Sequence, residues 1–325
     1  MSFFESVRLA LARHPVGVHV LSSSASEREL LTAEARLSRR LPSPQYREFL
    51  LTWNGGSMFH ESLVLLPAEQ VRVVKEKWLE IGESSDGLLW LDAQGRVVVV
   101  DEEQPDPLLA GSDFATWLDV VMAREALLLD REGEFRDVFD EEEGVLRVEI
   151  RKKRALAGRK RDRLASLYPL ELAELALEAG DDEQARTLLH EAVTSDPQAG
   201  PAWELLAALH RQAGDSEGAH DAYLRAAAAT PSVSLRAMRL LEAAELSPHQ
   251  AAVLVDAATA ADPQLGTRLI AQVRTYLASQ DVEESKRLLA KLQLIAAQKR
   301  LAATEHSEVE RIERDLRARD ALRVL

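Results

Sequence analysis

The sequence contains no cysteine, which excludes disulfides, thiolate metal sites and cysteine nucleophiles. This composition suits a reducing compartment. No stretch approaches the roughly 20 apolar residues that span a bilayer. The first residues also lack the basic region and long apolar run of a secretory signal. We therefore expect a cytoplasmic protein without a membrane span.

Sequence motifs of catalysis are also missing. There is no glycine loop ending in Gly-Lys-Ser/Thr, no GxGxxG after a strand, no HExxH pair and no GxSxG elbow. His210 and His220 lack carboxylates at metal-ligand spacing. We expect no enzyme, no catalytic residue, no cofactor and no metal. The pair His60 and Glu61, close to an Asn-Gly-Gly turn, keeps a hydrolase hypothesis open.

Basic residues are scarce relative to acidic ones, with 40 Lys and Arg against 54 Asp and Glu and a net charge of −14. The excess is segmented. Residues 1–150 are strongly acidic, residues 151–163 are basic, and the remainder is mildly acidic. An acidic surface favours basic partners and disfavours nucleic acid. The basic segment alone could bind nucleic acid or an anionic membrane, but it has no interleaved aromatic residues.

The segment Leu41–Gly56, LPSPQYREFLLTWNGG, predicts a short helix with a defined stop at each end. Pro42 and Pro44 break any preceding helix, and Ser43 can cap the next one. Four apolar residues then recur at helical spacing: Tyr46, Phe49, Leu50 and Trp53. The fold-defining turn follows, Trp53-Asn54-Gly55-Gly56, in which Asn and Gly can take the left-handed conformation that ends a helix.

The same segment resembles the signature of the SUKH superfamily. Three further segments continue the resemblance in order: Leu63–Pro67 with Glu69 and Val71, Leu89–Asp92 with Gly95–Asp101, and Ser112–Phe114 with Trp117–Leu118. Together they cover about residues 25–130. The superfamily contains bacterial toxin-immunity proteins and a fungal cell-wall regulator. The resemblance implies an immunity role for this region.

Local patterns complete the expected elements of this region. Phe3, Phe4, Val7 and Leu11 predict an N-terminal helix over 2–13, and a strand is expected over 16–21. Ser26 and Glu29 form a capping box for a helix. A helix over 68–81, a hairpin of strands 88–91 and 96–100, and a helix over 113–129 follow. The order lacks parallel crossovers, so we predict an α+β domain over 1–150.

The end of this domain carries an acidic segment, and a basic joint is predicted over 151–165. Acidic candidates for binding a partner are Asp101, Glu102, Glu103, Asp140, Glu141, Glu142 and Glu143. Phe135, Val138 and Phe139 lie near the second acidic run. Such a run is usually a solvated face, and the two nearby phenylalanines add support for the alternative, contact with a partner. The basic joint could instead pair with that run.

Residues 166–325 are rich in Ala and Leu and repeat. Pro197 and Pro231 stand 34 residues apart and Pro263 follows after 32 more, with small and large residues at matching places before each. The pattern resembles the tetratricopeptide repeat, with a capping helix at the end. The resemblance implies an all-α helical solenoid. It also places five residues toward a groove for a peptide or a helix: Glu174, Glu178, Glu204, Arg211 and Gln212.

Two function hypotheses follow. The first is an immunity-type protein that binds and neutralises a cognate toxin by occlusion, steered by the attraction of an acidic surface for a basic toxin domain. The second is a two-module scaffold or adaptor that holds clients in its repeat groove and on its acidic domain. The presence of a repeat domain distinguishes this chain from single-domain immunity proteins.

Overall fold

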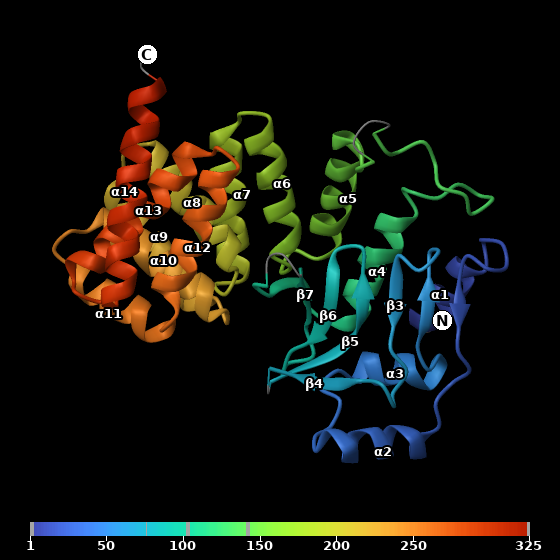
Figure 1. The fold of residues 1–325 in the computed structure, drawn as a ribbon. Coiled ribbons are helices and arrows are strands. Elements are labelled where there is room, and N and C mark those ends of the chain that lie inside the picture. Colours follow the sequence, from blue (N-terminus) through green and yellow to red (C-terminus); the bar gives the residue numbers. More distant parts are fainter. Residues whose placement is uncertain (1–2, 76, 102–104, 141–143, 324–325) are drawn as a thin grey trace. The chain divides into compact units, whose positions relative to one another are not determined.

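The computed structural model describes residues 3–75, 77–101, 105–140 and 144–323. It shows an antiparallel sheet region followed by a run of consecutive helices (Figure 1). The chain divides into two compact units, residues 1–202 and 203–325. The α+β class followed by a helical, solenoid-like region is therefore confirmed. The type of repeat and the boundaries 1–150, 151–165 and 166–325 stay predictions.

One antiparallel sheet of eight strands organises the described part of the first unit. Its path runs β1-β2-β3-β5-β6-β7-β8, and β4 pairs with β5. The strands are β1 (Val20–Leu21), β2 (Gly56–Met58), β3 (Leu63–Leu65), β4 (Arg72–Val74), β5 (Trp78–Ser84), β6 (Gly87–Leu91), β7 (Val97–Val100) and β8 (Leu108–Gly111). Mostly consecutive neighbours make this sheet largely a meander, as short turns between antiparallel strands allow.

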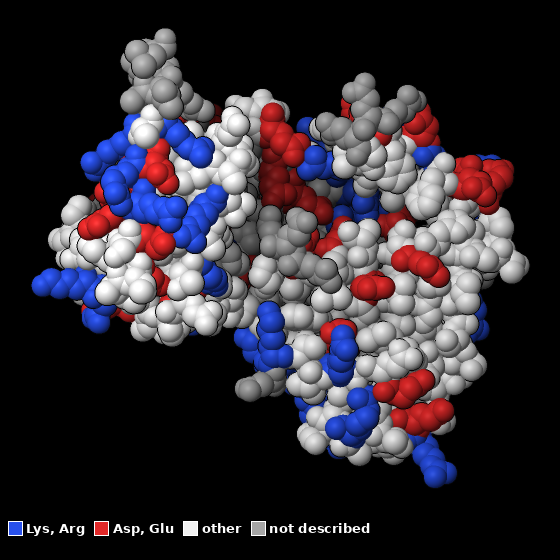
Figure 2. Space-filling view, in the orientation of Figure 1, with Lys and Arg blue, Asp and Glu red and all other residues white. Residues whose placement is uncertain are grey.

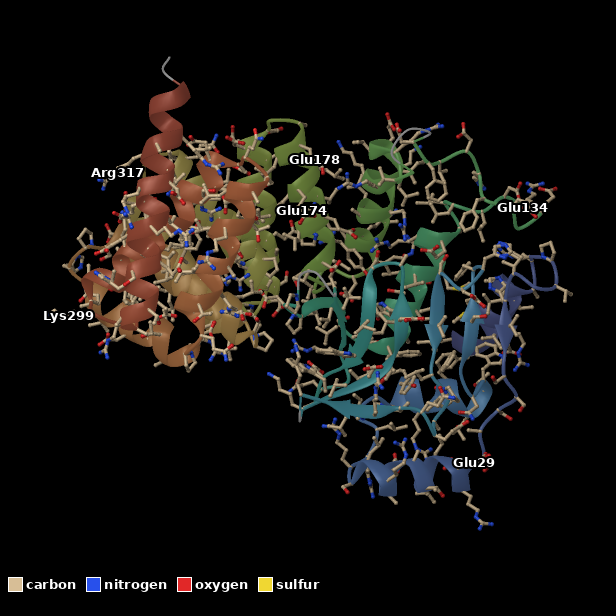
Figure 3. The ribbon with its side chains drawn as sticks, in the orientation of Figure 1. Glu29, Glu134, Glu174, Glu178, Lys299 and Arg317 are labelled. Carbon is tan, nitrogen blue, oxygen red and sulfur yellow. The ribbon has the colours of Figure 1, made fainter. Side chains whose placement is uncertain are left out.

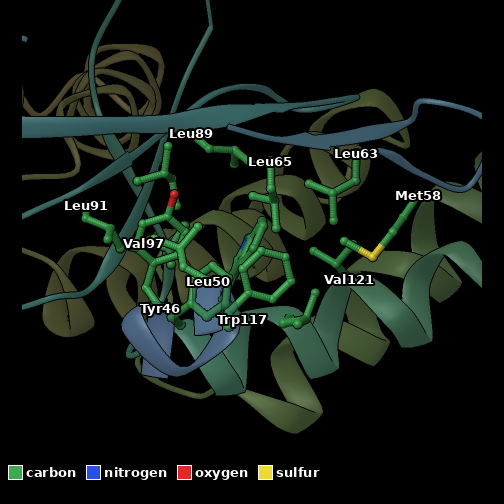
Figure 4. Packing of buried hydrophobic residues seen from close by; sticks show 14 of the residues in the cluster. Tyr46, Leu50, Met58, Leu63, Leu65, Leu89, Leu91, Val97, Trp117 and Val121 are labelled. Carbon is green, nitrogen blue, oxygen red and sulfur yellow. The ribbon is translucent and has the colours of Figure 1, made fainter. Parts of the chain in front are cut away.

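The main core lies between one face of the sheet and the helices α1 (Phe3–Leu11), α2 (Glu27–Leu37), α3 (Pro44–Thr52) and α4 (Phe114–Glu125). Figure 4 shows sheet side chains pointing onto Tyr46, Leu50 and Trp117 of these helices. Phe114 contacts both Tyr46 and Phe49 with its ring. The predicted aromatic stripe therefore fills the centre of the unit.

The other face of the sheet is also covered. Trp78 and Trp90 pack with ring centroids 5.3 Å apart, and Val98 and Val100 join them. Val97 and Val99 point instead into the main core. The unbroken valine run thus belongs to a strand that is buried on both sides, as its composition predicts.

The predicted helix in Leu41–Gly56 is confirmed. Ser43 caps α3 by accepting a hydrogen bond from the amide of Tyr46 at 3.1 Å. The turn that follows differs in one detail, because Gly55 and Gly56 take positive φ values of 80° and 129° and Asn54 does not. Asn54 works through its side chain, whose Oδ1 accepts from the Ala68 amide at 2.8 Å.

Three expected elements were wrong or too long. The described residues within 68–81 form no helix: β4 and β5 pair there, with Val74 opposite Trp78. β-Branched residues pack well on a pleated surface, and this preference outweighs the helical spacing of Val71, Val74 and Trp78. The strand expected over 16–21 is reduced to Val20–Leu21, and α4 ends at Glu125 instead of Leu129.

Residues of the predicted basic joint form the helix α5 (Val148–Arg161), which packs against α4 and α6. Arg154, Ala155 and Gly158 are buried. An added Cβ at Gly158 would lie 2.5 Å from the ring of Tyr168, so the glycine permits the close approach of α5 and α6. The first unit also includes α6 (Leu167–Glu178) and α7 (Asp182–Ser195).

The remaining helices are α8 (Gly200–Gln212), α9 (Ser216–Ala229), α10 (Val233–Leu246), α11 (Ala251–Ala261), α12 (Leu265–Ala278), α13 (Val282–Ala297) and α14 (Ala303–Arg323). Small residues at repeated places are fully buried, such as Ala219 and Ala226 in α9 and Ala258 in α11. Within the described residues, no helix combines the length and the apolar composition that crossing a membrane requires.

Candidate functional site

The predicted acidic candidates lie only in part within the described residues. Asp101 and Asp140 are exposed. Glu102, Glu103 and the run Glu141, Glu142 and Glu143 lie outside the described residues. Binding of a partner by this set stays a prediction.

The described part of the same region contains a surface of acidic and aromatic side chains. We call it the acidic–aromatic surface and define it as Glu132, Glu134, Phe135, Asp137 and Phe139. All five are exposed, and Glu134 is labelled in Figure 3. Phe135 and Phe139 are 46% and 38% exposed, and their rings meet edge to face with centroids 5.9 Å apart. Two exposed rings in contact form an apolar anchor of the kind enriched in protein interfaces.

Short-range contacts order this surface. Phe135 makes a β-bridge with Leu129, and Phe139 makes one with Leu146. Arg147 donates from Nε to the carbonyl of Phe139 at 3.1 Å and pairs with Asp137 at 2.5 Å. The ring of His60 lies 5.9 Å from that of Phe135. The two phenylalanines are therefore held on an ordered loop rather than on a free tail.

Phe59, His60 and Glu61 form a left-handed segment, with φ values of 56°, 53° and 69°. This conformation costs a non-glycine residue about 1–2 kcal/mol, so surrounding contacts must hold it. His60 Nε2 donates to the carbonyl of Gly133 at 2.7 Å, and its amide donates to the carbonyl of Val18 at 3.0 Å. Within the described residues the structure gives no hydrogen bond between His60 and Glu61, so the hydrolase hypothesis gains no support.

His19 holds the same segment. Its Nδ1 accepts the amide of Phe59 at 3.2 Å, so Nε2 carries the proton and faces Nδ1 of His14 at 2.9 Å. Protonation of Nδ1 would break the bond to Phe59. Burial, with the nearby His14 and His60, lowers the pKa of His19 to about 4.

We expect the pH dependence of stability to report this histidine. Because its folded pKa is lowered from 6.5 to about 4, its contribution is complete above pH 6.5 and is lost as the pH falls toward 4. After allowance for its partial exposure, the loss is about 1–2 kcal/mol. Urea denaturation between pH 7.5 and 5 measures it. His19→Asn, which keeps an acceptor that does not titrate, should flatten the curve in this window; an unchanged slope would contradict the assignment.

A polar pocket of about 660 Å³ is the second feature of the first unit. It lies among the β5–β6 turn, the end of α4, the segment before α5, and the helices α5 and α6. Its lining residues are Asp86, Arg124, Val145, Leu146, Arg151, Arg154, Glu171, Glu174 and Leu175. Figure 2 shows the carboxylates of α6 as a red column beside blue side chains of α5.

Ion pairs cross this pocket. Arg124 Nη2 donates to Glu171 at 2.8 Å, and Arg151 binds both carboxylate oxygens of Glu178 at 3.0 and 3.1 Å. Arg154 pairs with Glu125 at 2.7 Å, and both side chains are less than a tenth exposed. Burial raises the pKa of three nearby carboxyls against the opposing effect of the arginines: Glu125, Glu171 and Glu174.

The pocket walls are tied to the sheet. Asp162, at the end of α5, accepts the amide of Ser112 at 2.6 Å. Ser166 accepts the amide of Leu109, and the hydroxyl of Tyr168 donates to the carbonyl of Ala110 at 2.7 Å. These bonds fix α5 and α6 against the end of β8, so the pocket has a preorganised frame.

Glu174 and Glu178, predicted for the repeat groove, lie one turn apart on α6 and belong to this pocket and its rim (Figure 3). The other three groove candidates lie on α8 in the second unit. Glu204 pairs with Arg239 at 2.6 Å, Arg211 pairs with Glu242 at 3.1 Å, and Gln212 is exposed. Whether any of them binds a peptide stays a prediction.

Glu242 of α10 is the centre of a charged cluster that the sequence patterns do not reveal. Besides Arg211, it pairs with Arg287 at 2.6 Å and with Lys291 at 3.0 Å, both on α13. Lys291 is fully buried and also reaches Glu245 at 3.2 Å. Burial opposes ionisation of Glu242, but Lys291 and Arg287 outweigh it and lower its pKa. A hollow of about 600 Å³ lies beside this cluster.

Sequence reasoning missed the polar pocket, although one signal pointed to it. Asp162 stands 34 residues before Asp196, at the place where the helices of later repeats end. In both, Oδ1 accepts the amide two residues on, at 3.0 and 3.1 Å. The end of α5 therefore has the same cap, 34 residues earlier, as the end of α7.

No family model matches this chain, and no curated protein matches it either. Within the described residues, no group of three or more His, Asp or Glu side chains is arranged to hold a metal ion.

Proposed function

We propose that this chain is a protein-binding protein that acts without catalysis, and that it is of the immunity type. In this proposal the first unit binds a basic toxin domain and blocks it by occlusion inside the cell that makes both. The exposed Phe135–Phe139 pair within an acidic loop carries the proposal. We also propose that the segments resembling the SUKH superfamily form a domain of that type, and that the protein acts in the cytoplasm.

The charged and the apolar side chains of this surface have different roles in the proposed mechanism. Glu132 and Glu134 are exposed in the same loop as the two rings, so the surface attracts a basic partner before contact and speeds association. The rings then supply apolar area that is buried on binding and slows dissociation. Because the loop is ordered by its β-bridges, little conformational freedom is lost when the partner binds.

Removal of both rings should weaken the complex strongly. For Phe135→Ser with Phe139→Ser we expect capture of the partner from native cell extract to fall at least tenfold, since each buried anchor contributes about 2 kcal/mol. Quantitative mass spectrometry of the captured proteins measures the change. The captured protein should carry a basic domain, and its yield should fall at high salt.

A matched control uses exposed apolar residues elsewhere. Leu164 and Val253 are 61% and 71% exposed, more than either phenylalanine. Leu164→Ser and Val253→Ser should leave capture unchanged. Equal losses in the control variants would show that the phenylalanines have no special part and would contradict the proposal.

The immunity role itself requires a growth test. Coexpression of this chain with the toxin-like domain encoded by a neighbouring gene should restore growth, and the Phe135/Phe139 variant should restore less. Growth that is not restored, with capture of a partner intact, would instead favour the alternative role of a scaffold or adaptor. In that alternative the hollow beside Arg211, Glu245 and Arg287 would hold a charged client peptide.

A further inference from the structure

The polar pocket of the first unit has a composition that the proposed partner binding does not use. Its charged side chains are of both signs, with Arg124, Arg151 and Arg154 opposite Asp86, Glu171 and Glu174. Its remaining wall is aliphatic and consists of Val145, Leu146 and Leu175. A volume of about 660 Å³ falls within the range of small-molecule sites.

Four buried side-chain atoms without a hydrogen-bond partner belong to residues in the lining of this pocket or paired with it. The side chains of Arg124 and Arg154 are 4% and 8% exposed, and the Nε of each has no hydrogen-bond partner within the described residues. The Oε2 atom of Glu171 is likewise buried and unpartnered there, and so is that of Glu125, which pairs with Arg154 but does not line the pocket. Buried groups of this kind are costly unless a partner satisfies them.

The balance of charge narrows the class of ligand. A simple anion would be attracted by the arginines but would meet Asp86, Glu171 and Glu174. A simple cation would meet three arginines, and an apolar molecule would strip water from the more exposed charges, Arg151 and Glu174, without compensation. A molecule that carries one positive and one negative group on the same carbon, with an aliphatic body, fits the basic, acidic and aliphatic parts of the lining.

We propose that this pocket binds a free aliphatic α-amino acid. Its carboxylate faces the arginines, its ammonium group faces Glu171 and Glu174, and its side chain packs on Val145, Leu146 and Leu175. The hydrogen bonds from Asp162, Ser166 and Tyr168 to β8 hold the two helices that supply most of these groups. The site therefore needs no rearrangement of the sheet to form.

Isothermal titration of the full chain tests the proposal with a matched set of ligands. L-Leucine, L-isoleucine and L-valine carry both charges, N-acetyl-L-leucine lacks the ammonium group, and L-leucinamide lacks the carboxylate. At least one free amino acid should bind and raise the melting temperature, and both blocked analogues should bind at least tenfold more weakly. No binding by any of the three at millimolar concentration overturns the proposal, as does equal binding of either analogue.

Variants connect the binding to this pocket. Val145 is 50% exposed, so Val145→Trp can fill the mouth of the pocket without entering the core. Glu174→Gln removes one negative wall. Both should weaken binding at least tenfold, whereas Arg159→Gln, which breaks an ion pair with Glu191 outside the pocket, should not. Binding that survives both pocket variants overturns the assignment. The proposal stands apart from capture of a protein partner, so either can fail alone.

Discussion

Gly55→Ala is expected to destabilise the first unit by about 3–5 kcal/mol, which places it among the severe single substitutions. Gly55 has φ +80°, a conformation that costs alanine about 1 kcal/mol. The added Cβ would also lie 2.6 Å from the carbonyl oxygen of Leu65 and 2.7 Å from the nitrogen of Pro67. Both are backbone atoms, so the end of β3 must shift to make room.

Gly17→Ala supplies the matched control. Gly17 has φ +103°, but an added Cβ there meets no atom within 4 Å. We expect a loss of about 1 kcal/mol from the backbone conformation alone. Tryptophan fluorescence during urea denaturation follows the unit well, because Trp53, Trp78, Trp90 and Trp117 are all buried in it. Equal losses in the two variants would show that the contact with β3 is unimportant.

Lys291→Met should destabilise the second unit by about 2–4 kcal/mol. The substitution preserves most of the volume of the side chain but removes a fully buried charge that neutralises Glu242 and Glu245. Loss of one member of a buried ion pair leaves the other without compensation. The effect stays below the largest values because Arg211 and Arg287 still reach Glu242.

Lys286→Met, on the same helix, is the control. Lys286 is 42% exposed and pairs with Glu283 at 3.5 Å, so its loss should cost less than about 0.5 kcal/mol. Far-UV circular dichroism during urea denaturation measures both. Glu245→Gln added to Lys291→Met should recover at least about 1 kcal/mol, since it removes the carboxylate left unpaired. Strictly additive losses would mean that the pair is not coupled.

Much of the fold could be predicted because its signals are local. The cap at Ser43, the aromatic stripe of α3 and the turn between the predicted strands 88–91 and 96–100 each depend on residues a few positions apart. Asp92 accepts the amides of Gln94 and Arg96, both at 2.9 Å, within that turn. The β4–β5 hairpin was missed because Val71, Val74 and Trp78 satisfy the helical period as well as a strand.

The pocket could not be predicted for a different reason. Asp86, Arg124 and Glu171 lie on three segments that are far apart in the sequence, and no sequence pattern predicts that they come together. The sequence places Arg154 in a basic joint, and a run of like charges is usually solvated. Its burial depends on Glu125, 29 residues away, which supplies the opposing charge.

The contacts of α5 and α6 with the sheet limit how the N-terminal region can be moved from one protein to another by recombination. Ala165, Leu167 and Tyr168 belong to the same apolar cluster as the sheet and α1 to α4. A gene fragment that ended at residue 150 would leave this part of the cluster open to water and the carbonyl of Ala110 without its tyrosine. Recombination that transplants the N-terminal module intact must therefore carry at least the first helices of the repeat region with it.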